Sequence, residues 1–248
     1  MRSHLLGILA AAAAFGLSPL QAHAGTFSIS PLRVELSSAA QTGVLTIRNQ
    51  EATPVVVQAS TQLWEQAEGQ ERLSPTRDVL VSPAVFTIPA NGSQIVRVAL
   101  RRAPDGEREL SYRLILTEVP QPVSPDFTGL SVALRLSLPV FVAPSAEAQP
   151  RLDWSATQGA DGRLALEARN SGNAHARVLN FTVTPATGGA GGAIAQNTTA
   201  YILPGQSRTW TLDKNHNEAT SNTDWQRLRV KGTTEAGDFE VEARLEGG

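Results

Sequence analysis

The chain contains no cysteine, and this absence sets the first limits on its chemistry. Without a thiol it has neither a cysteine nucleophile nor a thiolate ligand for a metal ion. It also has no disulfide, although the export predicted below would permit one. Its stability must therefore come from hydrophobic cores large enough to fold unaided. The length suits two domains of about 100 residues each or one larger β-domain.

Lysine is nearly absent as well, since Lys214 and Lys231 are the only two. The basic residues are almost all arginine, and the 21 Lys and Arg against 23 Asp and Glu leave a formal net charge of −2. A charge this close to neutral argues against nucleic acid or an anionic membrane surface as the partner. Arginine is the better residue for holding a carboxylate in a semi-buried site, because its planar fork of donors matches both oxygens.

Histidine is also scarce, and beyond residue 24 the chain has only His175 and His216. Both lie in turn-like sequence with no acidic neighbour and no nucleophile in an elbow sequence, so we interpret them as ordinary turn or surface histidines. The aspartates are scattered rather than spaced as a calcium loop. We expect no metal site, no cofactor and no catalytic residue. A carbohydrate-active or hydrolytic enzyme without a known signature is the enzymatic alternative.

The chain has one long apolar run, and it lies at the N-terminus. Arg2 and His4 precede the apolar residues 5–17, and the small-residue sequence Ala22-His23-Ala24 follows them. This order is typical of a secretory signal peptide, and the run is too short for a helix that spans a bilayer. We expect residues 1–24 to be a signal peptide and the mature protein to be exported without membrane insertion.

From residue 25 onward the sequence consists of short alternating stretches separated by Gly, Pro, Asn or charged clusters. Apolar residues at every second position indicate β-strands with one buried face. A first series ends at residues 142–144, a short polar linker covers residues 145–150, and a second series follows. We predict an all-β protein with an N-terminal sandwich domain over residues 25–145 and a C-terminal β-sandwich domain over 146–248.

The sequence GLSVALRLSLPVFVAP at residues 129–144 carries an unusually complete apolar alternation. It forms the last strand of its domain and follows a long Pro-rich connection, so we expect it near the edge of a sheet. A long apolar edge is an aggregation hazard unless a partner uses it, and β-augmentation is the physically sensible use. The alternating residues are Leu130, Val132, Leu134, Leu136, Leu138 and Val140.

An ordered set of motifs resembles the PapD-like periplasmic chaperones of the chaperone–usher pathway. In chain order the motifs are ISPLRVEL, LTIRNQE, PVVVQASTQLW, LVSPAVFTIPANGSQIVRV, ELSYRLILTEVP, VALRLSLPVFVAP, NSGNAHARV and YILPGQSRTW. Any one of them is weak, whereas the ordered set is specific and covers essentially the whole mature chain. The blocks SPAVFTIPANGSQIVRV and SLPVFVAP are the strongest.

The resemblance implies two immunoglobulin-like β-sandwich domains in a boomerang arrangement. It also implies a chaperone that acts in the periplasm, without ATP or any cofactor. Such a chaperone binds and stabilises pilus or fimbrial subunits by donor-strand complementation and delivers them to an outer-membrane usher. The six alternating residues would be the donor residues. Arg33 matches the first-strand arginine that in the family binds the subunit's C-terminal carboxylate in the inter-domain cleft.

The sequence departs from the family pattern at two positions. Pro139 stands where the best-known members place a second anchoring lysine, and because proline offers no amide, pairing must be interrupted or altered there. Another basic residue is then needed, and Arg113 on an adjacent strand is the first choice, with Arg135 the second. Glu118 matches a family glutamate involved in inter-domain charge pairing, but the usual arginine partner appears here as Ala143.

The SLPVF sequence and the relocated anchor favour the archaic, Csu-like branch of the family. The leading alternative is a secreted structural protein, such as a pilin or adhesin with immunoglobulin-like domains. That protein would need a disordered N-terminal extension with its own alternating residues, and GTFSISPLRVEL is too short for an extension plus a first strand. The expected partners are pilin subunits and an outer-membrane usher, with no nucleic acid and no membrane.

Overall fold

The computed structural model describes residues 27–67, 69–120, 132–159, 163–186, 193–212 and 227–246. All regular elements within these residues are β-strands, so the all-β prediction is confirmed. In the described part of the chain, no helix has the length and apolar character that crossing a bilayer would need. The predicted signal peptide, Leu130 and His216 lie outside the described residues.

Strands β1 to β10 form two sheets around one apolar core. The first sheet has the order β1-β3-β8-β6, with β1 at Phe27–Ser30, β3 at Thr42–Asn49, β8 at Ser93–Leu100 and β6 at Val79–Ser82. The second has the order β2-β10-β9-β4-β5, with β7 also paired to β4. Its strands are β2 (Val34–Leu36), β10 (Arg135–Val142), β9 (Leu110–Val119), β4 (Val55–Ala67), β5 (Gln70–Pro75) and β7 (Val85–Ile88). In every one of these strands except β5, alternate residues face inward and fill the space between the sheets.

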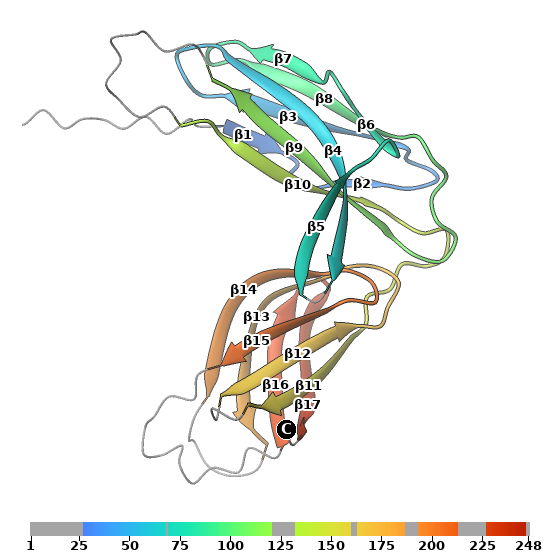
Figure 1. The fold of residues 1–248 in the computed structure, drawn as a ribbon, viewed down its shortest axis with the longest axis vertical. Coiled ribbons are helices and arrows are strands. Elements are labelled where there is room, and N and C mark those ends of the chain that lie inside the picture. The colour runs from blue at the N-terminus through green and yellow to red at the C-terminus, as the bar shows by residue number, and fades with distance from the viewer. Residues whose placement is uncertain are drawn as a thin grey trace, which may run out of the picture.

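Strand β4 has 13 residues, and its two halves serve different parts of the molecule. The first half lies in the sandwich, where it pairs with β7 on one side and with β9 on the other. The second half pairs with β5 at Gln62–Ala67, in a hairpin that reaches down to the other half of the molecule (Figure 1). One unbroken strand therefore links the first sandwich to the region between the two halves.

Strands β11 to β17 form one sheet in the order β14-β13-β16-β17-β11-β12-β15. Their bounds are β11 (Leu152–Gln158), β12 (Leu164–Asn170), β13 (Ala176–Pro185), β14 (Ile194–Ile202), β15 (Ser207–Leu212), β16 (Arg227–Thr234) and β17 (Gly237–Glu246). The sheet folds over so that its outermost strands meet, and Trp210 Nε1 of β15 donates to Thr198 Oγ1 of β14 at 3.4 Å. A second apolar core lies inside this fold, with Leu164, Val178 and Val230 among its fully buried members.

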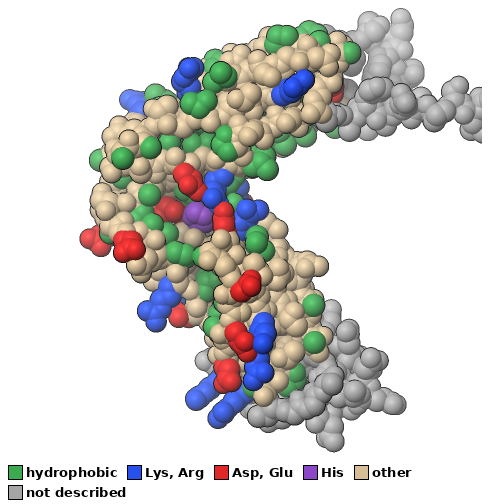
Figure 2. Space-filling model, turned by 180° about the vertical axis from the view of Figure 1, so that it is seen from behind, with side chains coloured by type: hydrophobic (Ala, Val, Ile, Leu, Met, Phe, Trp, Pro, Cys, Tyr) green, Lys and Arg blue, Asp and Glu red, His purple; other side chains and the backbone are tan. Residues whose placement is uncertain are grey.

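The two halves are set at an angle, like the arms of a boomerang (Figure 1). Among the described residues, no strand of β1–β10 pairs with a strand of β11–β17, and we refer to the halves as the N-terminal and C-terminal domains. On the concave side, arginine, acidic and histidine side chains gather between the arms (Figure 2). The expected boomerang of two immunoglobulin-like sandwiches is confirmed.

A buried asparagine ends one strand in each domain, Asn49 in β3 and Asn170 in β12, and both are fully buried. In each, Nδ2 donates at 2.7 Å to the carbonyl four residues later, and Oδ1 accepts at 3.0 Å from the amide two residues later. Each Nδ2 also reaches a distant carbonyl, that of Pro89 at 3.2 Å for Asn49 and that of Ile202 at 2.9 Å for Asn170. Both domains therefore turn the chain by the same device.

Replacing Asn170 with Ala should lower the free energy of unfolding by about 2–4 kcal/mol, because two buried carbonyls lose their donor. Asn170→Asp keeps the acceptor oxygen and should also destabilise, since it has no amide to donate. Asn197 lies exposed on β14, so Asn197→Ala is the matched control and should stay within about 0.5 kcal/mol of the wild type. Urea unfolding measures all three, and equal stability of Asn170→Ala and Asn197→Ala would contradict the assignment.

Candidate functional site

Half of strand β10 has an open edge. On one side β10 pairs with β9 along its whole length, from Arg135 opposite Thr117 to Val142 opposite Leu110. On the other side β2 pairs with it in parallel, but only at Val140–Val142. Within the described residues, no strand pairs with this side of β10 before Val140. The backbone of residues 135–139 is therefore available to another chain.

The alternation of the ladder shows which backbone groups face this open edge. The Glu118 amide donates to the Leu134 carbonyl at 2.8 Å, so the even-numbered residues of β10 direct their backbone groups toward β9. The odd-numbered residues face the other way, as Ala143 does when its amide donates to the last carbonyl of β2 at 2.8 Å. Arg135 and Ser137 therefore direct both an amide and a carbonyl to the open edge.

Pro139 fits this alternation without disturbing the sandwich. As an odd-numbered residue it faces away from β9, so its missing amide hydrogen removes no bond from the β9–β10 ladder. The β9–β10 ladder runs through Pro139 opposite Arg113, so the expected interruption or alteration of pairing does not occur there. For the open side it stays a prediction. There Pro139 offers a carbonyl alone, at the last position before β2 begins to pair.

The predicted donor side chains differ in exposure along the strand. Val132 is 74% exposed, and Leu134 and Leu136 are half-buried. Leu138 and Val140, with exposed fractions of 8% and 0%, belong to the core of the N-terminal domain itself. Assigning these two to a partner's groove is wrong in this structure, because they already fill their own sandwich. On the described part of the strand, a partner can therefore reach the apolar side chains of Val132, Leu134 and Leu136 only.

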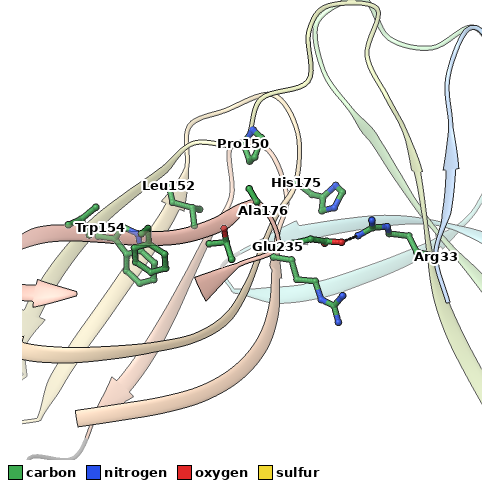
Figure 3. A pocket seen from close by; sticks show the side chains of 12 residues that line it. Arg33, Pro150, Leu152, Trp154, His175, Ala176 and Glu235 are labelled. Carbon is green, nitrogen blue, oxygen red and sulfur yellow. Dashed lines mark hydrogen bonds and ion pairs between the residues drawn. The ribbon is translucent and has the colours of Figure 1, made fainter. Parts of the chain in front are cut away.

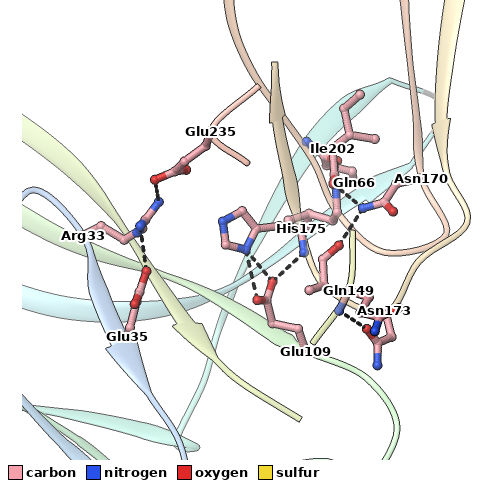
Figure 4. Close-up of polar contacts among 12 residues, drawn as sticks. Arg33, Glu35, Gln66, Glu109, Gln149, Asn170, Asn173, His175, Ile202 and Glu235 are labelled. Atoms are coloured by element: carbon pink, nitrogen blue, oxygen red, sulfur yellow. Dashed lines mark hydrogen bonds and ion pairs between the residues drawn. The ribbon is translucent and has the colours of Figure 1, made fainter. Parts of the chain in front are cut away.

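Arg33 lies where the open edge ends. It precedes β2 directly, and since Val34 stands opposite Val140, Arg33 comes beside the last open position. Its Nη2 forms an ion pair with Glu35 Oε1 at 2.7 Å, and its Nη1 pairs with Glu235 of the C-terminal domain (Figure 4). Burial alone would lower the pKa of the Arg33 guanidinium, but the hydrogen bond to Glu235 and the two carboxylate charges outweigh it and raise that pKa. Arg33 is thus a charged group in contact with both domains.

Arg113 projects from β9 opposite Pro139. Its guanidinium carbon lies 3.5 Å from the centroid of the Trp64 ring, and its Nη2 forms a 3.3 Å ion pair with Glu71 Oε1. Burial lowers the pKa of Arg113, and the charge of Glu71 offsets this effect only in part. Its Nε is buried without a hydrogen-bond acceptor among the described residues. Trp64 and Glu71 therefore hold the Arg113 guanidinium in place, and its Nε–H has no acceptor among the described residues. The role of Arg113 as second anchor stays a prediction.

Arg135 and Glu118 lie at the other end of the β9–β10 ladder, away from Arg33. Arg135 is exposed at the start of β10, at the far end of the open edge, so the structure does not bring it together with Arg33 and Arg113. Glu118 Oε2 accepts a hydrogen bond from the Leu134 amide at 3.1 Å, within its own domain. The inter-domain role expected for Glu118 is therefore wrong, because its carboxylate extends the β9–β10 ladder at the end away from the cleft.

The contact between the domains uses residues that sequence reasoning missed. His175 Nδ1 lies 2.8 Å from Glu109 Oε1, and that oxygen also accepts the His175 backbone amide at 3.0 Å (Figure 4). The His175 ring stacks on Phe141 with centroids 3.6 Å apart. The interpretation of His175 as an ordinary turn histidine is wrong. Its acidic partner lies 66 residues earlier, so no local pattern could have revealed it.

The β4–β5 hairpin adds a second contact through one side-chain amide. Gln66 Nε2 donates to the Tyr201 carbonyl at 2.9 Å, and Gln66 Oε1 accepts from the Leu203 amide at 3.0 Å. Beside it, Leu203 packs with Trp64 and Phe141 in a small buried cluster that both domains share. These contacts fix the C-terminal domain in relation to β10.

Two arginines lie near Tyr201 in the cleft. The guanidinium carbons of Arg113 and Arg177 are 6.0 and 5.2 Å from the Tyr201 ring centroid. No sequence signal singled out Arg177, which comes from the C-terminal domain. Although the whole chain is nearly neutral, the cleft has basic groups beside the end of an open edge. This arrangement can bind the carboxylate of a chain that lies along β10.

The Arg33–Glu235 pair predicts a pH dependence of stability. Burial would raise the pKa of the Glu235 carboxyl, but the hydrogen bond and charge of Arg33 outweigh it and lower that pKa below its ordinary value of 4.5. A lowered folded-state pKa stabilises the fold above the unfolded-state value, and this stabilisation is lost as the pH falls through the folded-state pKa. In urea unfolding at pH 7, the free energy of unfolding of the wild type should exceed that of Glu235→Gln by about 1 kcal/mol or less, since both partners are partly exposed. The difference should shrink below pH 4.5.

Arg33→Ala provides the control for this pH effect. In that background Glu235→Gln should change stability little at any pH, because the coupling partner is gone. A wild-type difference that stays constant from about pH 7 to about pH 3 would contradict the assigned pair.

Residues 26–148 match the family described as pili and flagellar-assembly chaperone, PapD N-terminal domain. None of the curated protein sequences matches the chain. Among solved structures, the fold is similar to a chain of the CsuC–CsuE chaperone–tip adhesion subunit pre-assembly complex from archaic chaperone-usher Csu pili of Acinetobacter baumannii. The identity is 22% and the TM-score 0.65, with 89% of this chain and 99% of that chain covered.

Two further structures have the same fold. One is the complex of the SafA pilin with the SafB chaperone from Salmonella enterica, at 18% identity and a TM-score of 0.59, covering 90% of this chain and 98% of that chain. The other is the CupB2 chaperone of Pseudomonas aeruginosa, at 18% identity and a TM-score of 0.54, covering 86% and 97%. The likeness extends across both domains.

Proposed function

This chain belongs to the PapD-like family of pili and flagellar-assembly chaperones, and we propose that it binds pilus subunits by lending them the open half of β10. The observation that carries this proposal is that the open edge ends at Arg33. An unpaired edge alone invites any extended chain. An edge that stops at a cation favours a chain whose own end lies there and carries a negative charge.

The direction of the bound strand follows from β2. Strand β2 runs parallel to β10 and occupies the edge from Val140 onward. A subunit strand in line with β2 and parallel to β10 pairs with Arg135 and Ser137 and then stops at Arg33. Its C-terminal carboxylate replaces Glu235 or Glu35 as the partner of the guanidinium. Because this pair is charge-assisted and directional, it sets the register of the added strand.

The apolar residues before the cleft complete the interaction. Val132, Leu134 and Leu136 keep surface that a partner can cover, so they supply alternating side chains to the open groove of an incomplete subunit sandwich. Folding of the subunit on this strand supplies the driving free energy, and the mechanism needs no ATP and no other cofactor. The chain acts as an assembly chaperone and not as an enzyme.

The proposed function also includes a cellular compartment and the delivery of the subunit. After removal of residues 1–24 the protein works in the periplasm and delivers its subunit to an outer-membrane usher. Residues 25–145 provide the donor strand and the anchoring Arg33 and Arg113, while residues 146–248 form the other wall of the cleft. A second anchor at Arg113 on β9, in place of a lysine at position 139, supports assigning the chain to the archaic, Csu-like branch of the family.

Two proline substitutions separate the open edge from the internal ladder. Ser137→Pro removes an amide that faces outward, so it should leave the fold intact and abolish subunit binding. Leu138→Pro removes an amide that faces β9 and disrupts the core, so it should lower the free energy of unfolding by about 3 kcal/mol or more. Urea unfolding and affinity capture from the periplasm of the native host, quantified by mass spectrometry, measure both effects. Undiminished capture by a folded Ser137→Pro variant would rule out strand donation along this edge.

Arg33→Ala should weaken subunit binding about 10- to 150-fold, the factor that corresponds to one hydrogen-bonded charged pair of roughly 1.5–3 kcal/mol. Arg33→Lys keeps the charge but loses the two-pronged geometry, so it should recover only part of the affinity. Titration of each variant against the captured subunit measures the loss. If Arg33→Ala binds the captured subunit with the affinity of the wild type, Arg33 is not the residue that anchors the subunit carboxylate.

A further inference from the structure

A pocket of about 380 Å³ opens beside Arg33, in the end of the C-terminal domain that faces the cleft. Leu152 and Trp154 of β11 line it on one side, and Phe239 and Val241 of β17 line it on the other. Figure 3 shows Arg33 at one end of the pocket and Trp154 at the other. The volume falls in the range of pockets that hold small organic groups.

The pocket exists because β11 and β17 separate toward the cleft. They pair in parallel only at Ala156 and Thr157, opposite the end of β17. Nearer the cleft, Leu152–Ser155 have no strand on that side among the described residues, and neither does the beginning of β17. The sandwich therefore opens at this end and leaves apolar side chains uncovered.

The rim of the pocket is charged, whereas its walls are mainly apolar. Arg33 and Arg177 contribute two guanidinium groups, and Glu235 contributes one carboxylate. Glu235 is already paired with Arg33. Arg177 forms no ion pair within the described residues, and its Nε is buried without an acceptor. Arg33 also pairs with Glu35, so the two guanidinium groups are balanced by two carboxylates. Arg177 nevertheless keeps a donor without an acceptor, which the carboxylate of a ligand can use.

We propose that this pocket binds the side chain of the last residue of a bound subunit, and that this side chain is aromatic or a large aliphatic one. The inference rests on the proposed function, because it needs the subunit carboxylate at Arg33. Arg33 lines the pocket as well as the end of the open edge, so a residue whose carboxylate meets Arg33 stands at the pocket mouth. Its backbone leads back along β10, and its side chain is then the group that enters the pocket.

A subunit end uses every part of this region at once. Its strand fills the open edge, its carboxylate meets the guanidinium groups, and its last side chain covers the apolar walls. A free carboxylic acid with an apolar body uses the pocket and the cations but leaves the edge of β10 unpaired. The continuity of edge, cation and pocket therefore favours the chain end as the occupant.

The test uses the ¹⁵N-labelled mature chain and three small probes. They are N-acetyl-phenylalanine, N-acetyl-alanine and N-acetyl-phenylalanine amide. Binding is followed at the indole N–H signal of Trp154, which is assigned by its loss in Trp154→Phe. N-acetyl-phenylalanine should bind about tenfold or more tightly than N-acetyl-alanine, since burial of an aromatic ring corresponds to at least that factor. It should also bind more tightly than its amide.

Two tryptophan variants form a matched pair. Val241→Trp fills the pocket, whereas Glu242→Trp adds the same group at the next, exposed position of β17. Val241→Trp should lose the preference for phenylalanine over alanine and keep the preference for acid over amide. Glu242→Trp should behave as wild type. If Val241→Trp does not fold, Ala236→Trp at the exposed mouth of the pocket replaces it.

The outcomes separate this inference from the function on which it rests. Equal binding of N-acetyl-phenylalanine and N-acetyl-alanine to the wild type would overturn the pocket inference and leave the Arg33 anchor intact. Equal binding of acid and amide would count against the carboxylate anchor itself. In capture from the periplasm, Val241→Trp should retain about a tenth or less of the subunit recovered with Glu242→Trp. Full recovery would show that the pocket does not serve the subunit's last residue.

Discussion

The pairing of β2 with the last three residues of β10 is the contact on which the site depends. Because Val34 stands opposite Val140, β2 covers the strand from that point only and leaves the preceding stretch open. The same register places Arg33 at the border between the covered and the open edge. A shift of two residues in either direction would lengthen or close the edge and would separate it from its cation. One short parallel pairing therefore determines both the length of the open edge and the residue at its end.

Phe141 connects this edge to the second domain. Its neighbours Val140 and Val142 face the core, whereas Phe141 faces the cleft, where it stacks on His175 and packs with Trp64. Since successive side chains of a strand point to opposite faces, β10 can fill its own sandwich and contact the other domain at once. The strand with the open edge thus also fixes the position of Glu235 and of the pocket relative to Arg33.

Sequence alternation predicted the parts of this structure that depend on near neighbours. The all-β fold and the two sandwiches followed from the period of two, whereas the place of Arg33 between the domains was implied only by the resemblance to the PapD-like chaperones. Alternation could not say whether Leu138 and Val140 fill their own core or a partner's, because both uses need the same residues. His175 and Glu109 meet only after both domains have folded, and the separation of β11 from β17 depends on a register between distant strands.

The open edge also has features that oppose edge-to-edge pairing of two copies. Natural sheets avoid unwanted pairing by keeping exposed edges short and by placing proline and charged side chains on them. This edge has all three features, since it covers few residues, ends at Pro139 and carries the exposed Arg135. Two copies meeting along their edges would each place a carbonyl opposite the Pro139 of the other copy, which has no amide to donate. The short length of the open edge and its proline therefore make it a poor template for a second copy of this chain.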